Sequence, residues 1–324
     1  MIKKLQYYIS TSLDPYKNLA TEKYLLDTVP EDVCTLYLWQ NQNTVVIGKN
    51  QNPWAECRCD LLKEEGGKLA RRLSGGGAVF HDIGNLNFTF LCSVENYDLS
   101  RQMQVIQHAC TLAGIKTELS GRNDLLVNGK KFSGNAFYNS KGKAYHHGTL
   151  LINANLKRMQ KYLTPPKAKL ETKGVKSVGA RVVNLSELAK DLTCEKMCPH
   201  MLSAFETVYG YVSTPVKLSN TEEILKYSKE YGSWDYLYSS TIPFTASASA
   251  QFPWGHANLL LQITAGKIAD AQLFTDAMDA SLPNIVCPLL TGCRLDASEI
   301  KQHLTTKLSP QLALDFCSLI TQII

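Results

Sequence analysis

The run of three glycines in "KLARRLSGGGAVFHD", residues 68–82, is the feature that most restricts how this chain can fold. Consecutive glycines lose much conformational entropy on folding, so they are kept where the backbone turns sharply or closely approaches another group. Strand-like segments lie on both sides of the run, "KLARR" before it and "AVFHD" and "GNLNFTFL" after it. We therefore predict a glycine loop inside an antiparallel sheet, with bare backbone and N–H groups facing an anionic ligand.

Two familiar phosphate-binding loops do not fit this setting. A dinucleotide fold needs G-x-G-x-x-G between a strand and a helix, and a P-loop needs G-x-x-x-x-G-K-[ST] before a helix. Here the glycines separate two strand-like runs, and no lysine follows at the required place. A tight hairpin with solvated arginines is the structural alternative. Because neighbouring strand residues point to opposite faces, one of Arg71 and Arg72 can face a ligand while the other serves the structure.

A second constellation, "GRNDLLVNGKKFSGNAFY", carries a lysine on a predicted hairpin. Asn128–Gly129 between two strand-like runs is a strong type I′ turn signal. Lys131 follows the turn and is suited to hold a phosphate or an acyl carboxylate as a point charge, whereas Lys130 faces the other side. Asp124 can hold Mg²⁺, which prefers one or two carboxylates plus phosphate oxygens. An exposed hairpin with solvated lysines is the alternative.

Two pairs of residues that contain histidine, His146–His147 and His81–Asp82, and one basic segment have open interpretations. His146 and His147 lie on one strand, so only one of them can face a site. Next to His81, Asp82 can simply begin the turn at "DIGN". The segment from Thr164 to Arg181 holds five basic residues against one acid, so it is either a lid over an anionic ligand or a solvated loop.

The remaining pattern predicts a larger domain followed by a smaller one. Helices are expected after Asp14, which can cap the first turn, over 100–114, from the cap Asn184, and over 193–210. After residue 245 the chain becomes rich in Ala and Ser, turns between two strands at 265–267 and ends with a helix over 298–308. We predict an α+β protein with domains at 1–245 and 246–324.

Bulk properties exclude several classes of protein. The formal net charge of +5 suits an anionic ligand or an acidic protein partner but is too small to indicate nucleic-acid binding. We expect neither a signal peptide nor a membrane-spanning segment, and ten scattered cysteines suit the reducing cytoplasm. The closest cysteine pairs, 57/59 and 194/198, lack C-x₂-C spacing, so no metal site built from thiolates is expected.

At this point the motifs resemble those of the lipoate–protein ligases, within the biotin/lipoate ligase superfamily. "RRLSGGGAVFHDIGNLNFTF" resembles their lipoate-binding loop, and "GRNDLLVNGKKFSGNAFY" resembles the strand pair that carries their lysine. "TVVIGKNQNPWAEC", "AYHHGTLLINANL", "KGVKSVGARVVNLSEL" and "SWDY" match in the same order, and "FPWGHANLLLQITAGKI" resembles an accessory domain. The resemblance implies a mixed, largely antiparallel sheet flanked by helices, like that of class II synthetases and biotin ligases, plus a small C-terminal α+β domain.

The resemblance also implies an ATP-dependent reaction in which lipoate becomes lipoyl-AMP and is then transferred to a lysine of an apo lipoyl domain. The implied acceptors are 2-oxoacid dehydrogenase acyltransferase subunits and the glycine cleavage H protein, and octanoate should also be accepted. Mg²⁺ would accompany ATP, with Asp124 as a candidate ligand, and 164–181 would be the adenylate-binding loop. The implied nucleotide-binding residues are Arg72, Gly77, Ala78, Val79, Phe80, Asp124 and the catalytic Lys131. The implied lipoate-binding residues are Arg71, Ser74, Gly75, Gly76, Lys131 and His147.

Three alternatives remain open on this reading. An octanoyl- or lipoyl-transferase of the same fold would use a cysteine nucleophile, and no cysteine lies between Cys110 and Cys194. A biotin ligase fits the glycine-loop motif less well. A non-catalytic lipoate or nucleotide sensor would keep the pocket but lose Lys131.

Overall fold

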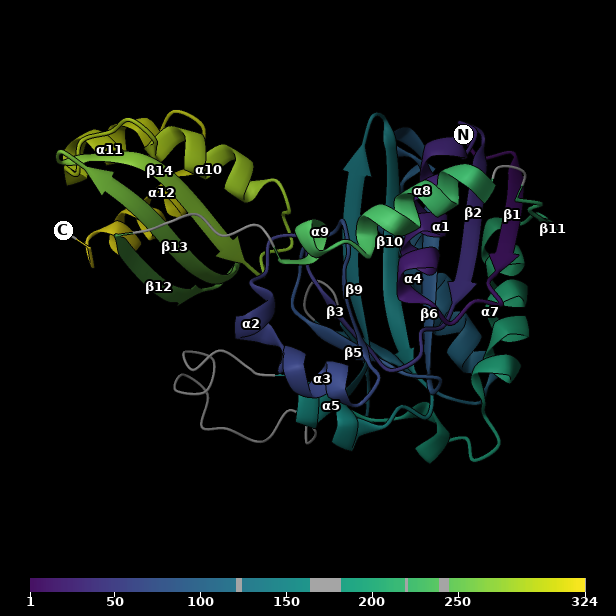
Figure 1. The fold of residues 1–324 in the computed structure, drawn as a ribbon. Coiled ribbons are helices and arrows are strands. Elements are labelled where there is room, and N and C mark those ends of the chain that lie inside the picture. The colour runs from purple at the N-terminus through teal and green to yellow at the C-terminus, as the bar shows by residue number, and fades with distance from the viewer. Residues whose placement is uncertain (121–123, 164–181, 219–220, 239–244, 324) are drawn as a thin grey trace.

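The computed structural model describes residues 1–324 except 121–123, 164–181, 219–220, 239–244 and 324. Figure 1 shows a large sheet covered by helices and, beside it, a smaller body formed by the C-terminal residues. The expected segment 164–181 lies outside the described residues. In the described part of the chain, no helix has the length and apolar character that crossing a bilayer requires.

The main sheet has eight strands and is mixed but largely antiparallel, as predicted. β1 is parallel to both of its neighbours, β11 and β2, and all the other adjacent pairs are antiparallel. The strands in spatial order are β11 (Ser213–Pro215), β1 (Lys4–Ile9), β2 (Val33–Trp39), β6 (Asn85–Ser93), β10 (Lys143–Leu151), β9 (Lys130–Ser140), β8 (Asp124–Val127) and β7 (Glu118–Ser120).

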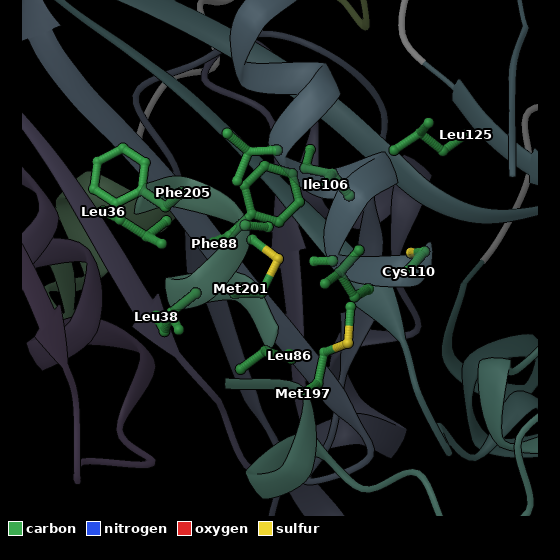
Figure 2. Packing of buried hydrophobic residues seen from close by; sticks show 14 of the residues in the cluster. Leu36, Leu38, Leu86, Phe88, Ile106, Cys110, Leu125, Met197, Met201 and Phe205 are labelled. Carbon is green, nitrogen blue, oxygen red and sulfur yellow. The ribbon is translucent and has the colours of Figure 1, made fainter. Parts of the chain in front are cut away.

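Helices cover both faces of this sheet, because successive side chains along its strands point to opposite faces and are apolar on both. Leu36 and Leu38 of β2 pack with α4 (Leu99–Leu112) and α7 (Cys194–Tyr209), in the core that Figure 2 shows. Tyr37 and Trp39, the alternate residues, pack with α1 (Pro15–Thr28) and α8 (Thr221–Tyr231) on the opposite face. The period of two in "GNLNFTFL" likewise sends Leu86, Phe88 and Phe90 into the α4–α7 core.

Local signals account for most element boundaries. Asp14 caps α1 by accepting the N–H groups of Tyr16 and Lys17, as expected. Asn128 and Gly129 have φ of 50° and 72° and join β8 to β9, as a type I′ turn requires. The helix expected from Asn184 is a single 3₁₀ turn, Leu185–Glu187, closed by a capping box.

The glycine loop belongs to a second, three-stranded sheet. β3 (Thr44–Ile47) is central, with β4 (Lys68–Arg71) parallel to it and β5 (Val79–His81) antiparallel to it. The prediction of a purely antiparallel setting was therefore wrong, because the loop passes over the end of β3 instead of closing a hairpin. The helices α2 (Pro53–Glu56), α3 (Cys59–Glu64) and α5 (Leu156–Tyr162) lie around this sheet in Figure 1.

The C-terminal domain has its own core and its own sheet of β12 (Ala246–Phe252), β13 (Gly255–Thr264) and β14 (Lys267–Thr275). The turn at Ala265–Gly266 is confirmed, with φ of 50° and 72°. Helices α10 (Leu282–Leu290), α11 (Ala297–Leu304) and α12 (Pro310–Ile320) pack on this sheet. The helix expected over 298–308 corresponds to α11, which ends at Leu304 and is therefore shorter than predicted. The chain enters this domain after α9 (Trp234–Tyr238).

Candidate active site

A cavity of about 230 Å³ lies between the glycine loop and the main sheet. Its walls come from α1, from strands of both sheets, from the glycine loop and from one residue of the C-terminal domain. The expected site residues that line it are Arg72, Gly76, Gly77, Ala78, Val79, Asp124, Lys131 and His147. The others in its lining are Leu19, Trp39, Val46, His81, Asn87, Gly134, Asn135, Ala136, Gly148, Thr149 and Met278.

Gly75 packs against the backbone of the C-terminal domain and does not line the cavity. A Cβ placed on Gly75 would lie 2.2 Å from the carbonyl oxygen of Ala277 and 2.7 Å from that of Met278, closer than real Cβ contacts. Gly76 has φ of +88°, a conformation that favours glycine. Gly77, by contrast, has nothing within 4 Å of its would-be Cβ and faces open space. Gly75 is therefore needed for close contact between the glycine loop and the backbone of the C-terminal domain.

The buried Arg72 holds the glycine loop in shape from inside. Its guanidinium donates to the carbonyl oxygens of Gly75 (2.7 Å) and Gly77 (2.8 Å), and its Nε to the hydroxyl of Ser74 (3.1 Å). Burial lowers its pKa to about 10, so it keeps its charge at neutral pH. Arg72 thus presents a fixed positive charge in the cavity wall.

Arg71 serves the structure, as one of the two arginines was expected to do. Its guanidinium donates to the carbonyl oxygens of Lys49 (2.9 Å), Gln51 (2.8 Å) and Leu237 (2.6 Å). Its Nε also donates to the carbonyl oxygen of Tyr236 in "SWDY" (3.1 Å), so Arg71 links the segment after β3 to α9. Arg71 does not line the cavity, so its expected contact with lipoate has no direct geometric support.

His147 is the histidine of its pair that faces the cavity. Its Nδ1 lies 2.9 Å from Oε1 of the buried Glu22, and its Nε2 lies 2.8 Å from the hydroxyl of Ser74. Because a carboxylate only accepts, Nδ1 carries the proton and Nε2 accepts from Ser74. His146 points away, stacked on Phe90 in the core. Only one histidine of the pair lines the cavity, as the alternation of side chains along a strand requires.

His81 also lines the cavity, a role that the sequence left undecided. Its Nδ1 lies 3.2 Å from Nδ2 of Asn41, whose oxygen already accepts from Asn18. The Asn41 amide therefore donates to Nδ1, which leaves the proton of the neutral ring on the unpaired Nε2. Burial, and then the positive charge of Arg72, lower the pKa of His81 to about 3. Asp82 accepts the N–H of Gly84 and begins the turn, as expected.

Lys131 and Asp124 form an ion pair at the accessible part of the cavity. Nζ of Lys131 lies 2.7 Å from Oδ1 of Asp124, and the two side chains are 39% and 41% exposed. The hairpin places them here because Asp124 pairs with Gly134 and Lys131 with Leu126 across the β-bulge. Without a Cβ, Gly134 leaves room for the lysine, whose Nζ would lie 3.0 Å from that atom. The ammonium group of Lys131 and the carboxylate of Asp124 therefore lie beside a largely buried cavity. Each is exposed enough to exchange its partner for a ligand.

Four of the twelve expected residues do not line the cavity: Arg71 and Gly75, described above, and Ser74 and Phe80. Ser74 is fully buried between His147 and Arg72, and Phe80 packs on Tyr162 in the core of the second sheet. Trp39 and Asn87 line the cavity but were not predicted. The alternation of residues along β6 could have predicted Asn87. Asn85, Asn87 and Thr89 form a polar stripe on one face of this otherwise apolar strand.

Comparison with known proteins identifies the family of this chain. Residues 14–206 match the model of the lipoyl protein ligase A/B catalytic domain, and residues 241–313 match that of the bacterial lipoate protein ligase C-terminus. The chain belongs to the lipoyl protein ligase A/B family. The matched catalytic region contains the glycine loop, Lys131 and His147, and the second match covers the C-terminal sheet.

Individual members of the family are similar over nearly the whole chain. Lipoate-protein ligase A of Psychrobacter cryohalolentis is 40% identical over 309 residues, which is 92% of this chain and 91% of that protein. The structure of P. falciparum LipL1 in complex with lipoate is 31% identical, covers 98% of this chain and 99% of that one, and has a TM-score of 0.85. Lipoate-protein ligase A bound with ATP, at 22% identity and TM-score 0.60 over 73% of this chain and 98% of that one, shares the fold.

Proposed function

We propose that this protein is an ATP-dependent lipoate–protein ligase that works in two steps. In the first, a carboxylate oxygen of lipoate attacks the α-phosphorus of ATP, so lipoyl-AMP forms and pyrophosphate leaves. In the second, a lysine amine of an apo lipoyl domain attacks the acyl carbon, so an amide forms and AMP leaves. The observation that carries the proposal is the placement of Lys131 beside a buried, mostly apolar cavity in a member of this family.

The cavity suits an acyl chain with a charged end. Leu19, Trp39 and Val46 line it, and Trp39 is almost fully buried. Each CH₂ group buried there contributes about 0.8 kcal/mol, so an eight-carbon acid gains several kcal/mol over a short one. Octanoate lacks only the two sulfur atoms of lipoate and should therefore also be accepted. The carboxylate of either acid would lie toward the exposed end, near Lys131.

Lys131 would act by neutralising two anions that must approach each other. The carboxylate and the α-phosphate repel, and a single ammonium group near both lowers the barrier as charge moves in the transition state. To do so, Lys131 must exchange its contact with Asp124 for oxygens of the two substrates. An exposed ion pair contributes only about 0–1 kcal/mol, so this exchange costs little.

Asp124 has the chemistry to bind Mg²⁺ together with ATP. Magnesium favours one or two carboxylates and takes its other oxygens from phosphates and water. The carboxylate of Asp124 is 41% exposed and borders the cavity, so it fits such a shared site. The ion would neutralise phosphate charge there, while Lys131 holds the reacting oxygens.

The remaining expected roles are proposed on the same basis. The backbone of Gly77, Ala78, Val79 and Phe80, with Arg72, would bind the nucleotide. Gly76 and His147 would contact the lipoyl group directly, whereas Ser74, Gly75 and Arg71 would support that wall from behind. We propose 1–245 as the catalytic domain and 246–324 as an accessory domain. We also propose apo lipoyl domains as protein partners and the cytoplasm as the compartment.

A transferase is the competing function, and the described cavity wall argues against it. A transferase needs a cysteine nucleophile at the acyl group, and no cysteine is among the described residues that line the cavity. A sensor without catalysis would have no need for Lys131 beside the pocket.

One experiment separates these functions. The protein is mixed with Mg-ATP, lipoate and an apo lipoyl domain, and the acceptor is weighed by mass spectrometry. The ligase predicts a gain of one lipoyl group that requires ATP. A gain that occurs only with an acyl-carrier-protein thioester would establish the transferase, and no gain with either donor would favour the sensor.

A further inference from the structure

Three potential metal ligands converge in the C-terminal domain, far from the cavity. Cys293 follows α10, and Glu299 and His303 lie on α11. Their ligand atoms, the thiol sulfur, a carboxylate oxygen and a ring nitrogen, all lie within 4.8 Å of one another. The sulfur of Cys293 is 3.3 Å from Nδ1 of His303. In the part of the chain that the structure describes, these residues form the one cluster of this kind.

The backbone holds these side chains in place. Cys293 is 1% exposed, its N–H donates to Leu290, and its carbonyl oxygen accepts from the N–H of Ile268 on β14. Asp296 caps α11 and so fixes the turn that carries Glu299. Since Glu299 and His303 are four residues apart on this helix, their side chains project from the same face. The cluster is therefore built by three elements of one domain.

The carboxylate of Glu299 is oriented as well. One of its oxygens accepts the N–H of Arg294 at 3.0 Å, and the other lies 3.7 Å from Nε of the same residue. The thiol of Cys293 also lies 3.2 Å from the carbonyl oxygen of Leu289. A divalent cation would offset the electrostatic cost of a thiolate beside a carboxylate.

The donor set selects the kind of cation. Zinc binds thiolate at about 2.3 Å and imidazole at about 2.0–2.1 Å in a tetrahedron, whose neighbouring ligand atoms are then about 3.5 Å apart. The observed sulfur–nitrogen separation of 3.3 Å is close to that edge. Magnesium and calcium prefer oxygen ligands and would not be selected by sulfur and nitrogen.

We propose that Cys293, Glu299 and His303 form a binding site for Zn²⁺, with water as the fourth ligand. Binding breaks the S–H bond of Cys293, forms the S–Zn bond and releases the proton to solvent. The spacing C-x₅-E-x₃-H does not contain C-x₂-C, so cysteine spacing alone pointed away from this site. The site is independent of the proposed catalysis.

The position of the site indicates a structural role. Cys293 is bonded to the start of β14, and the end of β14 reaches the segment that meets the glycine loop. At about 3.3 Å per residue, the strand places the site roughly 26 Å from that contact. Zinc should therefore stabilise the C-terminal domain without changing the rate of the catalytic step.

The test uses the full-length protein with His303→Ala as the main variant, because His303 is exposed and its loss should not disturb folding. Zinc affinity is measured by competition with a chromophoric chelator, and Co²⁺ is added as a spectroscopic probe of a sulfur ligand. Cys317→Ser, on α12 of the same domain, is the matched control for a lost thiol.

Wild type and Cys317→Ser should bind one zinc ion tightly and show a cobalt–thiolate charge-transfer band. His303→Ala should bind zinc at least about tenfold more weakly, and zinc should raise the unfolding temperature of wild type but not of this variant. Equal zinc affinity in His303→Ala and wild type, or no charge-transfer band in wild type, would overturn the proposal.

Discussion

The backbone N–H of Gly76 donates a hydrogen bond of 3.0 Å to the carbonyl oxygen of Ala277, so the C-terminal domain rests directly on the glycine loop. Two further bonds support the contact, one from the N–H of Thr275 to the carbonyl oxygen of Asn50 and one from the Asn50 amide to Ala280. Met278, next to Ala277, completes the cavity wall. The C-terminal domain thus contributes to the cavity wall.

Gly75→Ala should lower the free energy of unfolding by about 1–3 kcal/mol, because the new Cβ would clash with rigid backbone at Ala277. Gly77→Ala is the matched control, since the space around that position is open. Denaturant unfolding of both variants measures the difference. Equal stability of the two variants would contradict the packing described for Gly75.

Glu22→Leu should lower the free energy of unfolding by about 3 kcal/mol, and Glu22→Gln by less. The carboxylate accepts from His147 and from the hydroxyl of Thr89 (2.7 Å), which in turn accepts from Trp39. Leucine would leave buried donors unpaired, each at a cost of about 1–3 kcal/mol. The same variants should raise KM for lipoate, since His147 and Trp39 line the cavity. A Glu22→Leu protein as stable as wild type would contradict this network.

Acid should destabilise the protein partly through two buried histidines. Burial is the main cause that lowers the pKa of His81 and of His146 to about 3, from 6.5. Between these values the unfolded chain binds a proton that the folded protein does not, so stability is lost as pH falls from about 6.5 toward 3. Each histidine contributes a slope of up to about 1.4 kcal/mol per pH unit.

His146→Gln tests this slope, because His146 lies outside the cavity. The free energy of unfolding is measured at several pH values between 7.5 and 4.5 for wild type and variant. The variant should lose stability less steeply, by about 1.4 kcal/mol per pH unit below pH 6. Parallel curves would show that His146 is not held neutral by the fold.

Features of the fold set by neighbouring residues were predictable from the sequence. The Asn128–Gly129 turn places Lys131 on its strand, and Asp14 starts α1, because both depend on local backbone preferences. Strand alternation likewise predicted that only one residue of the His146–His147 pair can face a site, and only His147 lines the cavity. That the lysine hairpin and the glycine loop contribute to one site was implied by the family resemblance and not by these local preferences.

Contacts between distant segments were not predictable in the same way. The polar residues 40–43 lead from β2 of the main sheet to β3 of the second sheet. A polar turn between two strands of one hairpin would have the same local sequence pattern. The glycines were expected to make room for a ligand, yet Gly75 makes room for Ala277, two hundred residues away in the chain. Met278 in the cavity wall follows from the same long-range packing.

The most direct test of the account is pyrophosphate release by Lys131→Ala in the presence of Mg-ATP and lipoate. Lys130→Ala is the control, because Lys130 is exposed and does not line the cavity. Loss of a charge that stabilises the transition state should slow release by about 10²–10³-fold in Lys131→Ala, while Lys130→Ala stays near wild type. Release at the wild-type rate from Lys131→Ala would contradict the central role of this lysine in adenylate formation.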